Sequence, residues 1–259
     1  MFTLNQYEKY KNHYVPKAKL IKVENKSCRW NSKLEQLDIK TDNSYGVCFN
    51  ETGRLMHVYV SRGSWDEGKI DKTVFLYNKK NRPVTLLTFN VKSQILNYTI
   101  NLHYDSHNRI IQEIMEFENS GSYENYIHKY SDGNHTVLCH QDYYELTTDI
   151  VKEKINSKGK VIERKIYRFG GHVSLFEKYI YSSDGKLLYC FSLDEESKVS
   201  SETQYIGNFE TTFDRKDSNS ISVDETQTQY NDKGHWVKKC TLRNGSLKFI
   251  EERSIKYHD

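Results

Sequence analysis

The sequence predicts an all-β protein: an antiparallel meander of about sixteen strands, made of repeated hairpins and curled into a shell, partial barrel or sandwich. Composition is the first reason, because 20 Tyr and 11 Phe favour strands, while Ala, the best helix former, occurs once. The second is a turn motif that returns every 24 to 28 residues. The third is the alternation of apolar and polar side chains around each copy of the motif.

The motif begins with an aromatic or apolar residue, here called the anchor. A small polar residue, two further polar residues, Gly or Asn, and usually a basic residue follow. Its clearest copy is Tyr181-Ser-Ser-Asp-Gly185-Lys-Leu187. Anchors stand at Phe49, Tyr77, Tyr104, Tyr130, Ile155, Tyr181, Tyr205, Tyr230 and Tyr257. The eight intervals between successive anchors span 208 residues, a mean of 26 residues per interval. The chain is therefore a tandem repeat of one supersecondary unit.

Each motif has the chemistry of a β-hairpin turn. The small polar residue after the anchor can accept hydrogen bonds from backbone N–H groups two residues on. The Gly or Asn can adopt the positive φ that sends the chain back antiparallel. Asn is among the few other residues that tolerate this conformation. The positions predicted to need it are Gly53, Asn81, Asn108, Gly133, Gly159, Gly185 and Gly234.

The units are expected to form a single β-repeat domain over residues 21–259, clear from residue 49 onward. Residues 1–20 are basic and Tyr-rich and are expected to form an N-terminal cap or a loose arm, and the sequence leaves both open. Residues 21–48 resemble a degenerate first unit, with Asn25-Lys-Ser as its turn. From Phe49 onward, each unit has two strands joined by the motif turn.

A second turn links each unit to the next. Candidates are Arg62-Gly63-Ser64, Asn119-Ser-Gly121, Gly170-Gly171 and Asn244-Gly245, with a longer polar loop at residues 214–220. Two turns per unit over eight units give about sixteen strands in sequential order. Such a sheet would extend about 75 Å if flat, and open sheets beyond about ten strands curl or fold over, so we expect a curled sheet.

At the anchor motifs the sequence resembles the YD, or RHS-type, repeats of bacterial proteins. The nearest match is Tyr230-Asn-Asp-Lys-Gly234-His-Trp236, followed by Asn244-Gly245 and Arg253-Ser-Ile-Lys-Tyr257. The array is short and degenerate, since only Tyr104-Asp105 keeps the literal Tyr-Asp pair. The resemblance implies a curled β-sheet associated with toxin delivery, toxin encapsulation, surface attachment or toxin neutralisation. The array is too short to enclose a toxin domain, which favours neutralisation by a small binding protein.

Charge and cysteine content constrain the partner and the compartment. The net charge is +3, with +5 over residues 1–40 and −6 over residues 190–229, and a concentrated basic face is missing; we therefore expect no nucleic-acid partner. Neither an apolar leader nor a long apolar run is present, so we expect no membrane partner and a cytoplasmic location. The five Cys are odd in number and far apart, which argues against a disulfide framework.

Chemical sites receive little support. The densest set of metal-ligand types is His135-Thr-Val-Leu-Cys139-His140, but on a strand His135 and Cys139 share a face and His140 points away, so we interpret the set as surface His beside a core Cys. His103 and His107 bracket a turn and are expected on the surface. No nucleophile motif or phosphate-binding loop occurs. We therefore expect no catalytic residue, metal or cofactor. Trp65, in a turn region, is the one candidate partner-binding residue.

These observations favour a non-enzymatic, protein-binding repeat protein. Our leading hypothesis is an immunity or neutralising factor for a bacterial toxin, with a partner protein such as a toxin domain encoded nearby. The alternative is a carbohydrate-binding or cell-envelope-associated repeat protein. An enzyme with its site in the mouth of the curled sheet ranks below both.

Overall fold

The computed structural model describes residues 7, 10–31, 36–62, 70–141, 146–167, 172–194, 196–215 and 220–258. Within them the chain forms eighteen strands. The strands are β1 (Ala18–Asn31), β2 (Gln36–Phe49), β3 (Leu55–Arg62), β4 (Ile70–Tyr77), β5 (Pro83–Asn90), β6 (Leu96–Tyr104), β7 (Ile110–Phe117), β8 (Tyr123–Ser131), β9 (Asn134–Gln141), β10 (Leu146–Ile155), β11 (Val161–Tyr167), β12 (Val173–Tyr181), β13 (Leu187–Leu193), β14 (Val199–Ile206), β15 (Phe209–Asp214), β16 (Ser220–Tyr230), β17 (Trp236–Arg243) and β18 (Ser246–Tyr257). No helix in the described part of the chain has the length and apolar character needed to cross a bilayer.

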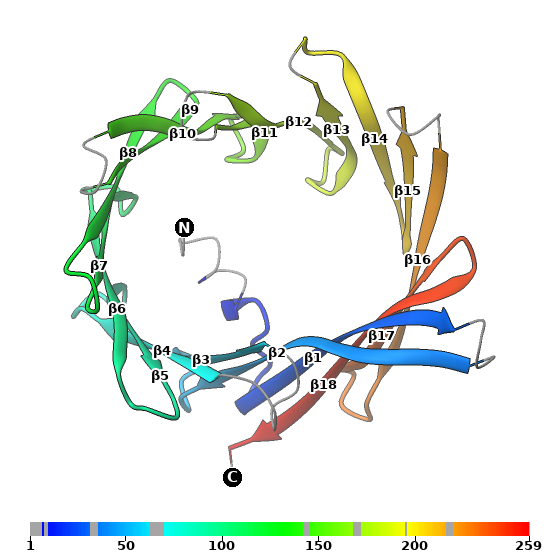
Figure 1. The fold of residues 1–259 in the computed structure, drawn as a ribbon, viewed down its shortest axis with the longest axis horizontal. Coiled ribbons are helices and arrows are strands. Elements are labelled where there is room, and N and C mark those ends of the chain that lie inside the picture. Colours follow the sequence, from blue (N-terminus) through cyan, green and yellow to red (C-terminus); the bar gives the residue numbers. More distant parts are fainter. Residues whose placement is uncertain are drawn as a thin grey trace.

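The strands form one closed antiparallel barrel. Each strand pairs with the next in sequence, and β1 also pairs with β18, which completes the ring seen in Figure 1. The predicted all-β meander and its curling are confirmed. The eight predicted units correspond to the sixteen strands β3–β18, and β1 and β2 are the two additional ones. Because the ring is closed, no strand among those described has a free hydrogen-bonding edge.

The turn proposed for the first unit is wrong. Asn25-Lys-Ser lies inside β1, where the pairing of β1 with β2 shifts register between Asn25 and Lys26. The shift is a β-bulge, which polar residues tolerate in a strand, so the polar triplet marks an irregularity in the ladder and not a reversal of the chain. The connection from β1 to β2 falls at residues 32–35, outside the described residues.

The motif turns have left-handed backbone at every position where the sequence suggested it. Gly53, Asn81, Asn108, Gly133, Gly159, Gly185 and Gly234 have φ between 62° and 83°. In the first turn the Asn50 Oδ1 atom accepts hydrogen bonds from the N–H groups of Thr52 and Arg54 at 3.1 and 2.8 Å. Among the second turns, Asn244 and Gly245 both have positive φ. Residues 63–64 and 170–171 lie outside the described residues.

Four of the anchor tyrosines, Tyr77, Tyr104, Tyr130 and Tyr181, bond to the backbone of the preceding unit. The hydroxyl of Tyr104 donates to the backbone carbonyl of Pro83 at 2.7 Å, and the hydroxyl of Tyr130 donates to that of Ile110 at 3.1 Å. The basic residue of the preceding turn covers the same ring, as Arg109 does over Tyr130 at 4.6 Å. The motif therefore carries both an anchor and the cation that stacks on the next anchor.

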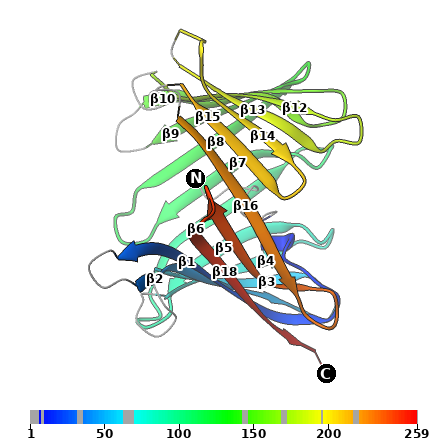
Figure 2. The same ribbon diagram turned by 90° about the vertical axis from the view of Figure 1, so that its right-hand side faces the viewer.

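The main core lies inside the barrel around the segment that precedes β1. Tyr10 and Val15 of this segment belong to one buried cluster with inward side chains of β1–β7. Its tyrosines contact aromatic rings of the wall, and the ring centroids of Tyr10 and Tyr45 are 5.6 Å apart. Figure 1 shows the segment within the ring of strands, and Figure 2 shows the strands of the wall from the side. The described part of the expected cap or arm, residues 10–17, thus fills part of the interior.

Gly53 shows how closely this segment meets the turns. A Cβ atom on Gly53 would lie 2.7 Å from Cζ of Tyr14, whereas one on Gly234 would meet nothing within 4 Å; both residues have positive φ. Gly234→Ala is expected to lower the free energy of unfolding by about 1–2 kcal/mol through backbone strain alone. Gly53→Ala is expected to lower it by up to about 1 kcal/mol more, because the outer end of the partly exposed Tyr14 ring must move away from Phe49. Urea titration of both variants measures the difference, and equal losses would contradict the packing of Tyr14 against this turn.

Candidate functional site

The inner face of the barrel, here called the inner wall, changes character along the chain. Residues directly opposite one another in the ladder share a face, so the wall can be followed from strand to strand. The residue two places before each anchor always belongs to it. In chain order this position holds Val47, Phe75, Leu102, His128, Glu153, Tyr179, Thr203, Thr228 and Ile255. The wall is therefore apolar at the first three anchors, mainly polar over the next five, and apolar again at the last, where Ile255 packs against the main core.

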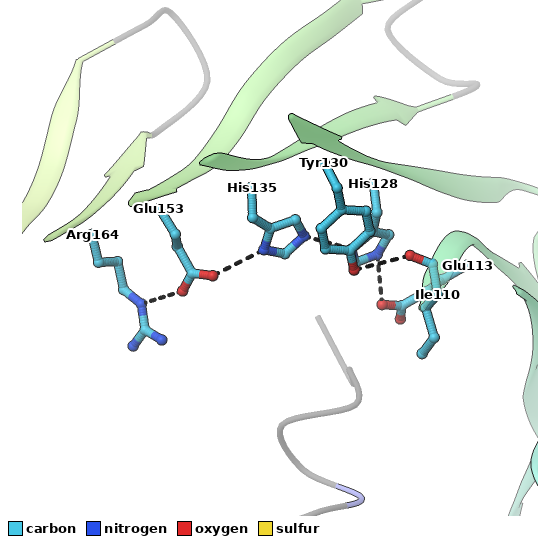
Figure 3. Close-up of polar contacts among 7 residues, drawn as sticks. All are labelled: Ile110, Glu113, His128, Tyr130, His135, Glu153 and Arg164. Carbon is cyan, nitrogen blue, oxygen red and sulfur yellow. Dashed lines mark hydrogen bonds and ion pairs between the residues drawn. The ribbon is translucent and has the colours of Figure 1, made fainter. Parts of the chain in front are cut away.

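A hydrogen-bonded row of charged side chains lies where the wall becomes polar. His128 Nε2 lies 2.9 Å from Glu113 Oε1, and His128 Nδ1 lies 3.1 Å from His135 Nε2. His135 Nδ1 lies 2.9 Å from Glu153 Oε2, and Arg164 Nε donates to Glu153 Oε1 at 2.8 Å. Figure 3 shows this inner-wall network, whose members come from the neighbouring strands β7–β11. Glu113 and His128 are sealed, with side chains 2% and 6% exposed.

The proton content of the inner-wall network follows from its geometry. Three hydrogen bonds join Glu113, His128, His135 and Glu153, so three hydrogens are shared among these four groups, one per bond. If both carboxyls are ionised, the histidine pair holds one positive charge. If Glu113 holds a proton, both rings are neutral. Either way the four groups carry a net charge of −1, which the guanidinium of Arg164 cancels, so the network is neutral as a whole and suited to a part-buried place.

Electrostatic partners control the ionisation of Glu153. Burial acts to raise the pKa of this carboxyl, but the hydrogen bonds from His135 and Arg164 outweigh burial and hold the pKa below its ordinary value. For Arg164, burial acts to lower the pKa, but the bond to Glu153 outweighs it and the pKa is raised. Both groups are therefore held in their charged forms.

Stability is expected to decrease in acid through Glu153. A carboxyl whose pKa is lower in the folded than in the unfolded chain stabilises the fold above its unfolded pKa, and this contribution is lost as the pH falls through the folded value. The free energy of unfolding should therefore decrease as the pH falls below about 4.5. Urea titrations across this range measure the slope. The slope should be smaller in Glu153→Gln, and an unchanged slope would show that other carboxyls account for it.

The prediction that His135 lies on the surface is wrong. His135 lies on the inner wall in the network, not on the outer surface, because it shares a face with Cys139 and that face points inward. The side chains of His103 and His107 are exposed at their turn, as expected. In the part of the chain that the structure describes, no three His, Cys, Asp or Glu side chains are placed to hold a metal ion. Trp65 lies outside the described residues.

Sequence reasoning missed Glu113, His128, Glu153 and Arg164. A signal for two of them was present, because His128 and Glu153 occupy the position two before the anchor, where earlier units have apolar residues. A polar residue at a repeated core position indicates either an unfilled interior or a buried network. To distinguish these two cases, one must know which side chains face this residue from the two neighbouring strands.

Beyond the network, the inner wall of β12–β17, here called the open half, is not sealed by other described segments. Its inward side chains are half-exposed or exposed, in contrast with the buried ones on β2–β7. Hydroxyl groups are common there, and Thr203 bonds to Thr212 at 3.0 Å between their Oγ1 atoms. Arg243 donates twice to Asp224, at 2.8 and 2.7 Å. Burial, followed by the charge of Asp224, raises the pKa of Glu210.

Comparisons with known proteins give structural neighbours only. No family model and no curated protein matches the chain. A porin-like protein from Bacteroides uniformis is 10% identical, with a TM-score of 0.41 over 94% of this chain and 98% of that chain. The structure described as TcdB2-TccC3-TEV is 14% identical, with a TM-score of 0.43 over 86% of this chain but 14% of that chain. A DUF1329 family protein from Desulfovibrio piger is 8% identical, with a TM-score of 0.28 over 98% of this chain and 90% of that chain. These scores carry no functional argument.

Proposed function

We propose that this protein is a non-enzymatic binding protein that holds a polypeptide partner on the open half of its inner wall. One observation carries the proposal: the other half of the same wall already holds a polypeptide segment, the chain's own residues 10–17. That segment is bound largely through tyrosines, with Tyr10 against Tyr45 at 5.6 Å and Tyr14 against Phe49 at 5.1 Å between ring centroids.

The open half keeps the aromatic anchors of the occupied half, although the rest of its wall is mainly polar. Its anchors, Tyr181 and Tyr205, occupy the repeat positions of Phe49 and Tyr77. Short hydroxyl side chains lie on the same face of these strands, with Thr203 next to Tyr205 and Ser192 farther along, opposite Ser201. Tyr provides a large contact area at low entropic cost, and Ser provides adaptable hydrogen bonding, which is why protein-binding surfaces use both. A polypeptide segment therefore suits this wall.

Closure of the barrel limits the alternatives. A curled but open sheet could bind a partner by adding a strand at its edge. Here β1 and β18 are paired with each other, so edge addition has no strand to extend among those described. Binding must use side chains on a face of the sheet.

The biological role that we propose is neutralisation of a bacterial toxin in the cytoplasm. Resemblance of the anchor motifs to RHS-type repeats supports this role, and cell fractionation tests the location. The decisive experiment is purification together with the product of the neighbouring gene. If neither that product nor another toxin-like protein forms a complex, the neutralising role is wrong.

Site-directed variants test the place of binding in such a complex. Tyr205→Ala combined with Glu210→Gln removes a ring and a charge from the open half, and should weaken binding roughly tenfold or more. The matched control is Tyr59→Ala, where Lys72 covers the ring on the outer face. If the complex forms but both variants bind equally well, the binding site lies elsewhere.

A second candidate is binding of carbohydrate by the same wall. Half-exposed tyrosines and hydroxyls on β12–β16 are also groups that stack on and hydrogen-bond to sugars. Glycan-array binding that Tyr205→Ala abolishes would favour this candidate over a polypeptide. Absence of glycan binding together with a stable protein complex would exclude it.

A further inference from the structure

Large apolar side chains gather on the outer face of β13–β16. Phe213 lies opposite Ile221, and Phe209 lies opposite Ile206 on the same face, with Val223 opposite Thr211 between the two pairs. Ile206 and Ile221 are 60% and 56% exposed, and the other members are half-exposed or exposed. The set, here called the outer patch, consists of Phe191, Ile206, Phe209, Phe213, Ile221 and Val223.

The register explains why these side chains face outward. Thr203 and Thr212 bond to each other on the inner wall, so their neighbours in sequence point the opposite way. Leu76 stands apart opposite Thr85, and on β2 only the two residues Leu37 and Ile39 adjoin on one face, whereas the outer patch extends over four strands. Single exposed apolar residues are ordinary, but a contiguous patch indicates an interaction site.

Two carboxylates lie within the outer patch. Glu202 lies opposite Phe191 on one side and Phe213 on the other. Glu225 lies opposite Phe209. Among the described residues neither carboxylate forms an ion pair, and Glu225 Oε1 accepts one hydrogen bond, from Gln227 Nε2 at 3.2 Å. A partner that covers the patch must therefore bury or pair these two charges.

We propose that the outer patch binds a cationic amphipathic segment of a partner protein, one whose apolar side chains alternate with Lys or Arg. Covering Glu202 and Glu225 with purely apolar groups would bury two carboxylates without a cation. The desolvation free energy would then be unfavourable, and a nearby Lys or Arg is needed to offset it. A second copy of the chain, docked patch to patch about a two-fold axis, would bring like charges together. An anionic membrane surface would be repelled by the same groups. The proposal is independent of the inner wall, because the two sites lie on opposite faces of the sheet.

Fluorescence anisotropy with a labelled amphipathic Leu/Lys peptide tests the proposal. The peptide should bind the wild-type protein, and a Leu/Glu peptide of the same length should not. Phe213→Ser with Ile221→Ser should weaken binding roughly tenfold or more, and Glu202→Gln with Glu225→Gln should weaken it and reduce its salt dependence. The matched control is Leu76→Ser with Ile95→Ser, two exposed apolar residues outside the patch.

Three outcomes would overturn the proposal. One is equal binding of both peptides to the wild-type protein, or of the Leu/Lys peptide to all variants. Another is adsorption to phosphatidylcholine vesicles that the patch substitutions abolish, which would assign the patch to a lipid surface. The third is a wild-type dimer in sedimentation that Phe213→Ser with Ile221→Ser converts to monomer, which would assign it to a second copy. Circular dichroism of each variant establishes that the fold is intact.

Discussion

Replacing Phe75 by alanine is expected to lower the free energy of unfolding by about 3–5 kcal/mol. Phe75 is 1% exposed and lies in the main core, with its ring centroid 5.6 Å from that of Tyr7. Truncation loses the favourable free energy of transferring the ring from water to the core. It also leaves a cavity that the side chains of the wall and of the N-terminal segment fill only in part. Urea titration followed by tyrosine fluorescence measures the loss.

Leu76 provides the matched control on the same strand. It is the next residue of β4, points to the opposite face and is 44% exposed. Leu76→Ala is expected to change stability by less than about 0.5 kcal/mol, as surface substitutions generally do. Equal losses for Phe75→Ala and Leu76→Ala would contradict the placing of Phe75 in the core, and a larger loss for Leu76→Ala would mean that the two faces are exchanged.

Glu153→Gln is expected to cost about 2–3 kcal/mol, somewhat less than the loss of one partner from a fully buried ion pair. The Glu153 side chain is 10% exposed and that of Arg164 30%, so solvent screens part of the interaction. The amide removes the charge that balances Arg164 and can accept from only one of its two present partners through oxygen. Denaturant titration at neutral pH measures the effect.

Glu163 is the control for this change. It lies on the adjacent strand and pairs with Lys154 at 3.2 Å on the exposed outer face. Glu163→Gln is expected to cost no more than about 1 kcal/mol, since surface ion pairs contribute little. A double-mutant cycle of Glu153→Gln and Arg164→Gln isolates their interaction, and a coupling free energy near zero would contradict the network.

The regular part of the fold could be predicted because it depends on local chemistry. Left-handed positions such as Gly185 and Asn81 mark turns whatever surrounds them, and their spacing gave the sixteen strands β3–β18. Closure could not be predicted, because it depends on the pairing of Val23 with Arg253, residues at opposite ends of the chain. The same long-range pairing converts the irregular first unit into two well-formed strands.

The site was harder to predict than the fold. Alternation shows that His135 and Cys139 share a face, but it does not show which face is enclosed. Enclosure of His135 depends on His128 and Glu153, which lie on the neighbouring strands β8 and β10. The outer patch was missed for the same reason, since Phe213 and Ile221 become neighbours only through the register of β15 with β16.

Pairing of the first strand with the last has a consequence for biosynthesis. Before β18 is synthesised, the earlier strands can already have paired as hairpins. Strands β1 and β17, however, each keep one unpaired edge until β18 is present. Nascent chains on one messenger RNA can form hydrogen bonds with one another through these unpaired edges and aggregate. Pairing of β18 (Ser246–Tyr257) with both β1 and β17 therefore removes the two unpaired edges at once.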